Sequence, residues 1–207
     1  MKAQSRVEIT QLPLLGGVLC LDFVNTIDPR HRPPKLEYLA SYDALLDWAV
    51  HAGALTAPAA RGLSVLAGQH PTRAKRVHAR AISLREALYQ TLAPATRADH
   101  PQAPLAILNA EFQHSMTTAI LEPTPGGYRL GWAPTDQLDQ MLWPVARSAA
   151  DLLTSPSLGR VAECDGQGCG WLFVDTSKAG RRRWCSMAIC GNRAKSQRHA
   201  QRTASRP

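Results

Sequence analysis

The chain of 207 residues is long enough for one medium-sized domain and a small additional module. Hydrophobic residues make up 44% and charged residues 19%, which is typical of a globular protein and excludes a disordered or fibrous one. No apolar run approaches the roughly 20 residues of a membrane helix, and the N-terminus lacks the apolar core of a secretion signal. We therefore expect a cytoplasmic protein without a membrane partner.

The first half of the chain predicts one extended segment followed by helices. Residues 16–27 (GGVLCLDFVNTI) combine a glycine turn signal with β-branched and aromatic residues, which predicts an extended conformation. Prolines at positions 29, 33 and 34 then mark a loop. Apolar residues at helical spacing predict helices over residues 36–51, 57–67 and 72–92, the second of them capped by Thr56.

The second half predicts two more helices with a hairpin between them. A helix is expected over residues 104–121, a strand over 128–132 with a partner within 117–122, and a last helix over 135–153 that Pro144 interrupts. The turn-rich residues 154–157 then separate two units. The predicted fold is α+β: a mostly helical domain with a small β-sheet over residues 1–154, and a small module over 158–207.

The net charge of +8 lies entirely in residues 171–207, within the C-terminal module. Residues 171–207 contain nine Lys or Arg and one acid, Asp175, whereas fifteen bases balance fifteen acids in the first 170 residues. A neutral body with a cationic tail indicates a polyanionic partner, with nucleic acid favoured over a membrane surface. The simpler alternative is a solvated basic tail that only improves solubility.

Four of the five cysteines stand in this module as C-x4-C, a gap of 15 residues, and a second C-x4-C; they are Cys164, Cys169, Cys185 and Cys190. Two close thiol pairs joined by a loop supply the four ligands of a tetrahedral zinc ion. Four thiolates leave no open coordination position, so the site is structural rather than catalytic. A module too short for its own hydrophobic core needs a metal or disulfides, and a cytosolic location favours the metal. We predict one structural Zn²⁺.

The residues around the cysteines are suited to nucleic-acid contacts. A strand is expected over residues 171–174, and a helix is expected after Cys190 with Lys195, Arg198 and Arg202 on one face. Arginine offers bidentate contacts to phosphate or guanine. The candidate nucleic-acid-binding residues are Arg181, Arg182, Arg183, Asn192, Arg193, Lys195, Arg198 and Arg202.

The pattern C-x4-C…W-C-x4-C-G-N-R, which ends at Cys190-Gly191-Asn192-Arg193, resembles the CGNR zinc finger. The segments GGVLCLDFVNT, LREALY (residues 84–89) and Leu108-Asn109 resemble the ABATE domain, which precedes this finger in proposed bacterial stress-induced transcription regulators. The resemblance covers nearly the whole chain. It implies that the four cysteines bind zinc, that the finger binds DNA, and that the body senses a small ligand.

Some polar residues of the body stand in otherwise apolar settings, and Asp22, Asn25, Arg85 and Asn109 form a candidate ligand pocket. The alternative is that they cap helices or satisfy buried backbone groups. Arg85 lies on an apolar helix face and needs an anionic partner, which is either a ligand or Asp22.

The function predicted from these observations is that of a bacterial-type transcription regulator and not of an enzyme. The histidines are scattered, and none of the familiar catalytic motifs is present. The finger is expected to bind DNA, and the body to sense a small-molecule effector or to form a homodimer. Two alternatives stay open: a small-molecule-binding protein or enzyme whose finger is a structural or protein-docking element, and an RNA-binding protein.

Overall fold

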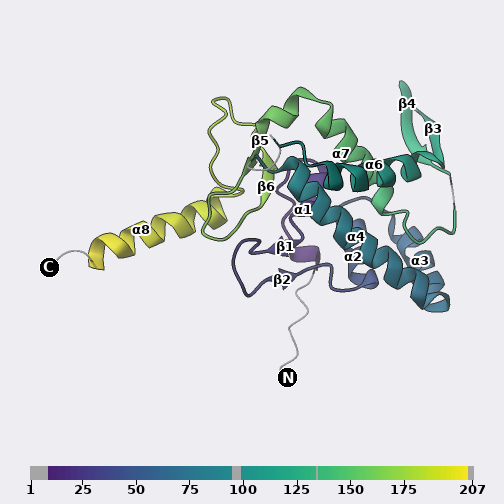
Figure 1. Cartoon of the computed structure of the whole chain (residues 1–207), viewed down its shortest axis with the longest axis horizontal. Helices are drawn as coiled ribbons and strands as arrows, with labels where there is room; N and C mark the ends of the chain where they lie inside the picture. Colours follow the sequence, from purple (N-terminus) through teal and green to yellow (C-terminus); the bar gives the residue numbers. More distant parts are fainter. Residues whose placement is uncertain (1–8, 95–98, 134, 205–207) are drawn as a thin grey trace.

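The computed structural model describes residues 9–94, 99–133 and 135–204, the last three by their backbone alone. Within these ranges the chain is mostly helical, with three two-stranded antiparallel sheets and a four-cysteine cluster near the C-terminus (Figure 1). The predicted fold class is confirmed. No helix in the described part is long and apolar enough to cross a membrane.

The predicted extended segment at residues 16–27 is wrong, because its centre forms the short helix α1 (Leu19–Val24) after the 3₁₀ turn η1 (Ile9–Gln11). Cys20, Leu21, Phe23 and Val24 of α1 are all buried, since α1 packs against other elements on several sides. A short apolar run that is buried all round has no helical or strand periodicity, so sequence alone does not separate the two.

The next helix starts later than predicted. Leu36–Glu37 forms strand β2, which pairs with β1 (Ile27–Asp28), and α2 (Tyr42–His51) begins after Ser41, whose hydroxyl accepts the N–H of Ala44 at 3.1 Å. The helices predicted next are confirmed as α3 (Ala57–Gln69), which Thr56 caps, and α4 (Pro71–Leu92).

The remaining body elements are present with shifted boundaries, and the helix predicted to end at residue 121 ends at Met116 because residues 119–121 belong to a strand. Helix α6 (Gln102–Met116) leads into the hairpin of β3 (Ala119–Thr124) and β4 (Gly127–Trp132). The last body helix, α7 (Leu142–Leu153), begins seven residues after the predicted start. Pro144 therefore lies in its first turn, where the missing N–H costs no helical hydrogen bond.

One hydrophobic core runs through the body and into the C-terminal module. Helix α4 lies in the middle and contacts α1, α2, α3, α6 and α7. The same buried cluster contains Trp48 of α2 and, from the module, Trp171, Leu172 and Phe173 together with the four cysteines. The predicted division into residues 1–154 and 158–207 stays a prediction, since the core crosses it.

The module consists of the 3₁₀ turn η2 (Pro156–Arg160), the paired strands β5 (Val161–Glu163) and β6 (Leu172–Val174), the π-helical turn η3 (Met187–Gly191) and helix α8 (Asn192–Ala204). The strand predicted at 171–174 and the helix predicted after Cys190 are both present. Helix α8 contacts η3 and extends away from the rest of the molecule (Figure 1).

Candidate metal centre and nucleic-acid interface

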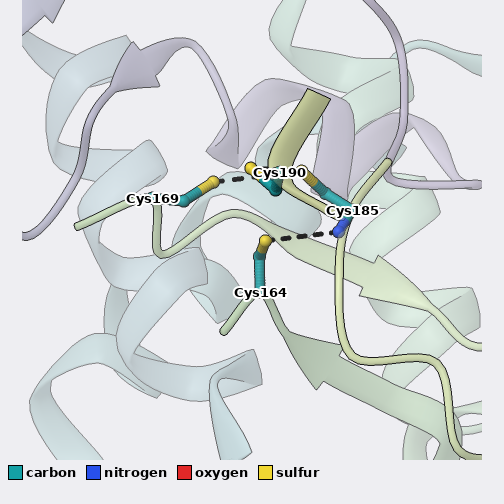
Figure 2. Close-up of side chains that lie close together, drawn as sticks. All are labelled: Cys164, Cys169, Cys185 and Cys190. Carbon is teal, nitrogen blue, oxygen red and sulfur yellow. Dashed lines mark hydrogen bonds between the residues drawn. The ribbon is translucent and has the colours of Figure 1, made fainter. Parts of the chain in front are cut away.

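The four predicted zinc ligands converge on one point. Cys164 follows β5, Cys169 lies in the turn before β6, Cys185 precedes η3, and Cys190 lies within η3. Their Sγ atoms all lie within 4.8 Å of one another, and the four side chains point toward a common centre (Figure 2). All four are buried and none forms a disulfide.

The spacing of the sulfur atoms suits a tetrahedral zinc ion. Cys185 Sγ lies 3.7 Å from Cys190 Sγ and 3.9 Å from Cys169 Sγ. Zn–S bonds of about 2.3 Å in tetrahedral geometry place the sulfurs about 3.8 Å apart. A disulfide would require a separation of about 2.0 Å. The donor set and its geometry therefore fit a closed, structural Zn²⁺ site.

The four buried thiols shift one another's pKa values in opposite directions. Hydrogen bonds with the thiols of Cys169 and Cys185 lower the pKa of Cys164. Hydrogen bonding to this thiolate raises the pKa of Cys169 and Cys185, and burial raises that of Cys190. Only a bound cation makes four adjacent thiolates favourable, and Zn²⁺ supplies that charge.

Two glycines leave room for the metal site. A Cβ atom on Gly166 would lie 2.8 Å from Cys190 Sγ and 3.3 Å from Cys164 Sγ, so a larger residue would displace two ligands. A Cβ on Gly191, the residue after the last ligand, would lie 2.8 Å from Met187 Sδ. Gly166 therefore depends on the absence of a side chain, whereas the exposed Met187 side chain can move away from a larger residue at position 191.

The body holds the first cysteine pair through backbone hydrogen bonds. The N–H of Arg30 donates to the carbonyl of Cys169 at 2.9 Å, and the N–H of His31 donates to that of Gly168 at 3.0 Å. The indole of Trp171 donates to the carbonyl of Ile27 at 3.0 Å. The loop after α1 thus lies directly against the metal site.

Two family models match the sequence of this chain. Residues 17–156 match the ABATE family, which is described as "Putative stress-induced transcription regulator", and residues 160–203 match the CGNR zinc finger. The chain belongs to the ABATE family. A comparison with curated proteins gave no match. The four buried cysteines are the zinc site of the CGNR finger, and the predicted cofactor is confirmed.

Most of the candidate nucleic-acid-binding residues lie on the surface of the CGNR finger. Arg181, Asn192, Arg193, Lys195 and Arg198 are exposed. Arg183 is exposed too and pairs with Asp165 at 2.7 Å. The side chain of Arg202 lies outside the described residues. DNA contacts by these residues stay a prediction.

Arg182 differs from its neighbours because its side chain faces inward. Its Nε donates to the carbonyl of Trp184 at 2.9 Å, and its Nη2 donates to the carbonyl of Cys185. Its guanidinium also lies 4.3 Å from the centre of the Phe173 ring. Arg182 therefore stabilises the backbone around the third zinc ligand, Cys185. Because its guanidinium makes these internal contacts, little of the side chain is left to contact a partner.

The candidate ligand-pocket residues of the ABATE domain occupy separate environments, and no described contact joins any two of them. Asp22 accepts the N–H of Gly16 at 2.7 Å, Asn25 is hydrogen-bonded to Leu172, and Asn109 is exposed on α6. The expectation that Asp22 partners Arg85 is wrong, because Glu37 and Glu86 do so. Ligand binding at these four residues stays a prediction.

Arg85 is the centre of an ionic network with buried guanidinium groups and partly exposed carboxylates, and sequence reasoning missed its partners. Its side chain is 3% exposed; Nη1 and Nη2 donate to the two carboxylate oxygens of Glu37 at 2.6 and 2.7 Å, and Nε donates to Glu86 at 2.9 Å. Arg30 donates to the other oxygen of Glu86 at 2.8 Å and stacks on Tyr89. In the sequence, the adjacent charged residues Arg85 and Glu86 interrupt the apolar pattern of α4, and this feature could have indicated an ionic network.

A cavity of about 1140 Å³ lies beside this network. It is lined by β2, α2 and α3, with Leu36, Tyr38, Leu46 and Val50 supplying apolar surface and Glu37, Asp43, Asp47, Lys35 and Arg61 supplying charge. Glu37 thus belongs both to the cavity wall and to the partners of Arg85. No sequence motif pointed to these lining residues as a group.

Proposed function

We propose that this ABATE-family chain regulates transcription by binding duplex DNA through the cationic surface of its CGNR finger. The observation that carries the proposal is helix α8. No described residue of α8 belongs to the hydrophobic core; the helix contacts η3, and Gln197 bonds to Gln167, which lies between the first two cysteines. A helix of 13 residues is marginal in water by itself, so we expect a bound partner to stabilise it beyond its contact with η3.

The charge on this surface defines the partner as a polyanion. Arg181, Arg193 and Lys195 are exposed; the charge of Arg193 acts on the carboxylate of Asp28, and Arg181 and Lys195 form no ion pair among the described residues. The pair between Arg183 and Asp165 is 63% and 49% exposed, so it contributes little and can open toward a phosphate. Arginine and lysine on a projecting helix suit the phosphates that flank a DNA groove.

The aromatic residues of the finger favour duplex DNA over single-stranded RNA or DNA. Single strands are bound by exposed rings on which bases stack. Trp171 is 5% exposed and Phe173 is fully buried, and the ring of Trp184 is covered in part by Arg183. The described part of the finger offers no exposed aromatic platform, whereas α8 has the width of the major groove.

The test is charge reversal within the full chain, because the shared core rules out a truncation that removes the finger. In the triple variant Arg193→Glu/Lys195→Glu/Arg198→Glu, binding to a labelled duplex should weaken at least tenfold. The slope of log K against log salt concentration should fall by up to about 3, since each lost phosphate contact contributes about 0.9. Fluorescence anisotropy at several salt concentrations measures both quantities.

The matched control reverses three exposed cations of α4, in Arg73→Glu/Lys75→Glu/Arg76→Glu, which changes the net charge by the same amount. This variant should keep most of the affinity and the full salt slope. Equal losses in the two variants would mean that net charge alone drives binding and would contradict the proposed interface. Absence of DNA binding by the wild-type chain would instead support a finger that is only structural.

The cavity beside Glu37 supports the second part of the proposal, that the ABATE domain senses a small ligand. Its volume suits a metabolite-sized molecule, and its wall combines apolar and charged groups as ligand sites do. An Ala44→Trp variant places a bulky ring in the cavity from the half-buried wall of α2 and should reduce any ligand-dependent rise in melting temperature found in a metabolite screen. A shift that survives this substitution would place the ligand elsewhere.

A further inference from the structure

The finger exposes two large apolar side chains beside its cationic helix. Met187 is 63% exposed and Ile189 is 43% exposed, both in η3. The other large apolar residues of the described finger are buried or half-buried, with Leu172 and Phe173 at 0%. Since exposing Met187 and Ile189 to water is unfavourable, their position calls for a partner.

The turn that carries the two side chains is held rigidly. Zinc ligands Cys185 and Cys190 bracket it, and Ser186 accepts the N–H of Ile189 on its hydroxyl at 3.3 Å and that of Gly191 on its carbonyl at 3.1 Å. Gly191 has no Cβ, which lets Met187 Sδ lie over its backbone. The backbone that carries the exposed pair is therefore fixed by the zinc ligands and by Ser186.

The charges around the pair determine the class of partner. Arg183 precedes the turn and Arg193 follows it, and both are exposed. Arg183 can exchange its exposed partner Asp165 for an anion of the partner, whereas a purely apolar protein surface would desolvate both cations and supply no anion. Duplex DNA offers phosphates to the arginines and an apolar group, the C5-methyl of thymine, on the floor of the major groove.

The order of the elements places Met187 and Ile189 at the N-terminal end of α8. Helix α8 begins at Asn192, directly after η3, so Met187 and Ile189 lie at its N-terminal end. In helices bound in the major groove, the N-terminal residues contact base edges. Resting on the DNA binding proposed above, we propose that Met187 and Ile189 contact thymine methyl groups in the major groove.

The first experiment replaces the pair in the full chain. The variant Met187→Ala/Ile189→Ala should bind an alternating dA–dT duplex about tenfold more weakly, in the range of a lost base contact, with the salt slope unchanged because no phosphate contact is removed. Zinc content of one ion per chain confirms that the finger is intact. The control Val65→Ala, on an equally exposed apolar residue of α3, should bind like the wild type.

The second experiment removes the methyl groups from the DNA. The wild-type chain should bind the dA–dU duplex about tenfold more weakly than the dA–dT duplex, and the double variant should bind the two equally. A wild-type chain that binds both duplexes with equal affinity would overturn this inference and leave the DNA-binding proposal standing. A wild-type chain that binds neither at low salt would overturn the DNA-binding proposal itself.

Discussion

Asn25 and Leu172 form two hydrogen bonds with each other across the boundary between the ABATE domain and the finger. The amide nitrogen of Asn25 donates to the carbonyl of Leu172 at 2.8 Å, and the N–H of Leu172 donates to Asn25 Oδ1 at 2.9 Å. Both residues are buried. The Asn25 side chain, at the C-terminal end of α1, therefore hydrogen-bonds to the backbone of β6 next to the zinc site.

Replacing Asn25 should destabilise the whole chain. Asn25→Ala leaves the N–H and the carbonyl of Leu172 unpaired in the core, which costs about 2–4 kcal/mol of unfolding free energy. Asn25→Asp should also destabilise, because its carboxylate loses the donor and places a charge in the core. Urea titration measures both. The control is Asn109→Ala on the exposed face of α6, which should stay within about 0.5 kcal/mol of the wild type.

Removing zinc should destabilise more than the finger. Because the cysteines belong to the same core as the ABATE domain, a chelator should unfold β5, β6 and α8 and also lower the melting temperature of the remainder. Cys185→Ser should reduce zinc below one ion per chain. The control Cys20→Ala, on the buried fifth cysteine of α1, should keep the full zinc content while costing about 2 kcal/mol. A metal-free chain with an unchanged melting temperature would contradict this coupling.

Gly166→Ala should weaken the metal site through a steric clash alone. The added Cβ would lie 2.8 Å from Cys190 Sγ, closer than contacts of real Cβ atoms, so the sulfur has to move. We expect faster zinc transfer to a chromogenic chelator. Gly159→Ala in the same module meets no atom within 4 Å and should transfer zinc at the wild-type rate. Equal rates for the two variants would show that the site relaxes around the methyl group.

The Glu37–Arg85 pair should contribute more to the unfolding free energy than a surface ion pair does. Glu37→Gln leaves the buried guanidinium with Glu86 as its one remaining carboxylate, and we expect a loss of about 2 kcal/mol, below the full value for a buried pair because Glu37 is partly exposed. The comparison is Asp151→Asn, which breaks the exposed pair with Arg147 and should cost less than about 0.5 kcal/mol. Similar losses in the two variants would argue against the network as a stabilising element.

The pH dependence of stability should contain a contribution from Asp22. Burial raises the pKa of Asp22 from 3.8 to about 6, against the opposing effects of the Gly16 N–H and of His51. The folded state then holds this proton more tightly than the unfolded state, so the favourable contribution is present below pH 4 and is lost as the pH rises through 6.

Asp22→Asn removes this titration and keeps an oxygen that accepts the N–H of Gly16. The unfolding free energy of the variant relative to the wild type should therefore increase between pH 5 and pH 7, by about 1 kcal/mol after allowing for the partial exposure of the group. Chemical denaturation of both proteins at each pH measures the difference, in which effects common to the two cancel. A difference that does not change with pH would contradict the assignment.

The amino-acid sequence by itself determined the metal site and most of the helices. The two C-x4-C pairs are local, since each brings its thiols together within one turn, and zinc coordination leaves few other arrangements. Helices α3 and α4 could be predicted because one face is apolar and the other polar over three or more turns. The cationic character of residues 171–207 also needed no coordinates.

Only the tertiary structure decided how the finger and the body meet. The helical state of α1, the link between Asn25 and Leu172 and the partners of Arg85 all depend on contacts between residues far apart in the sequence. A buried apolar run has no periodicity to read, and a polar side chain has many candidate partners until the chain is folded. Arg182 and Arg183 are identical neighbours in sequence, yet one is directed into the finger and the other to its surface, because packing against Phe173 selects between them.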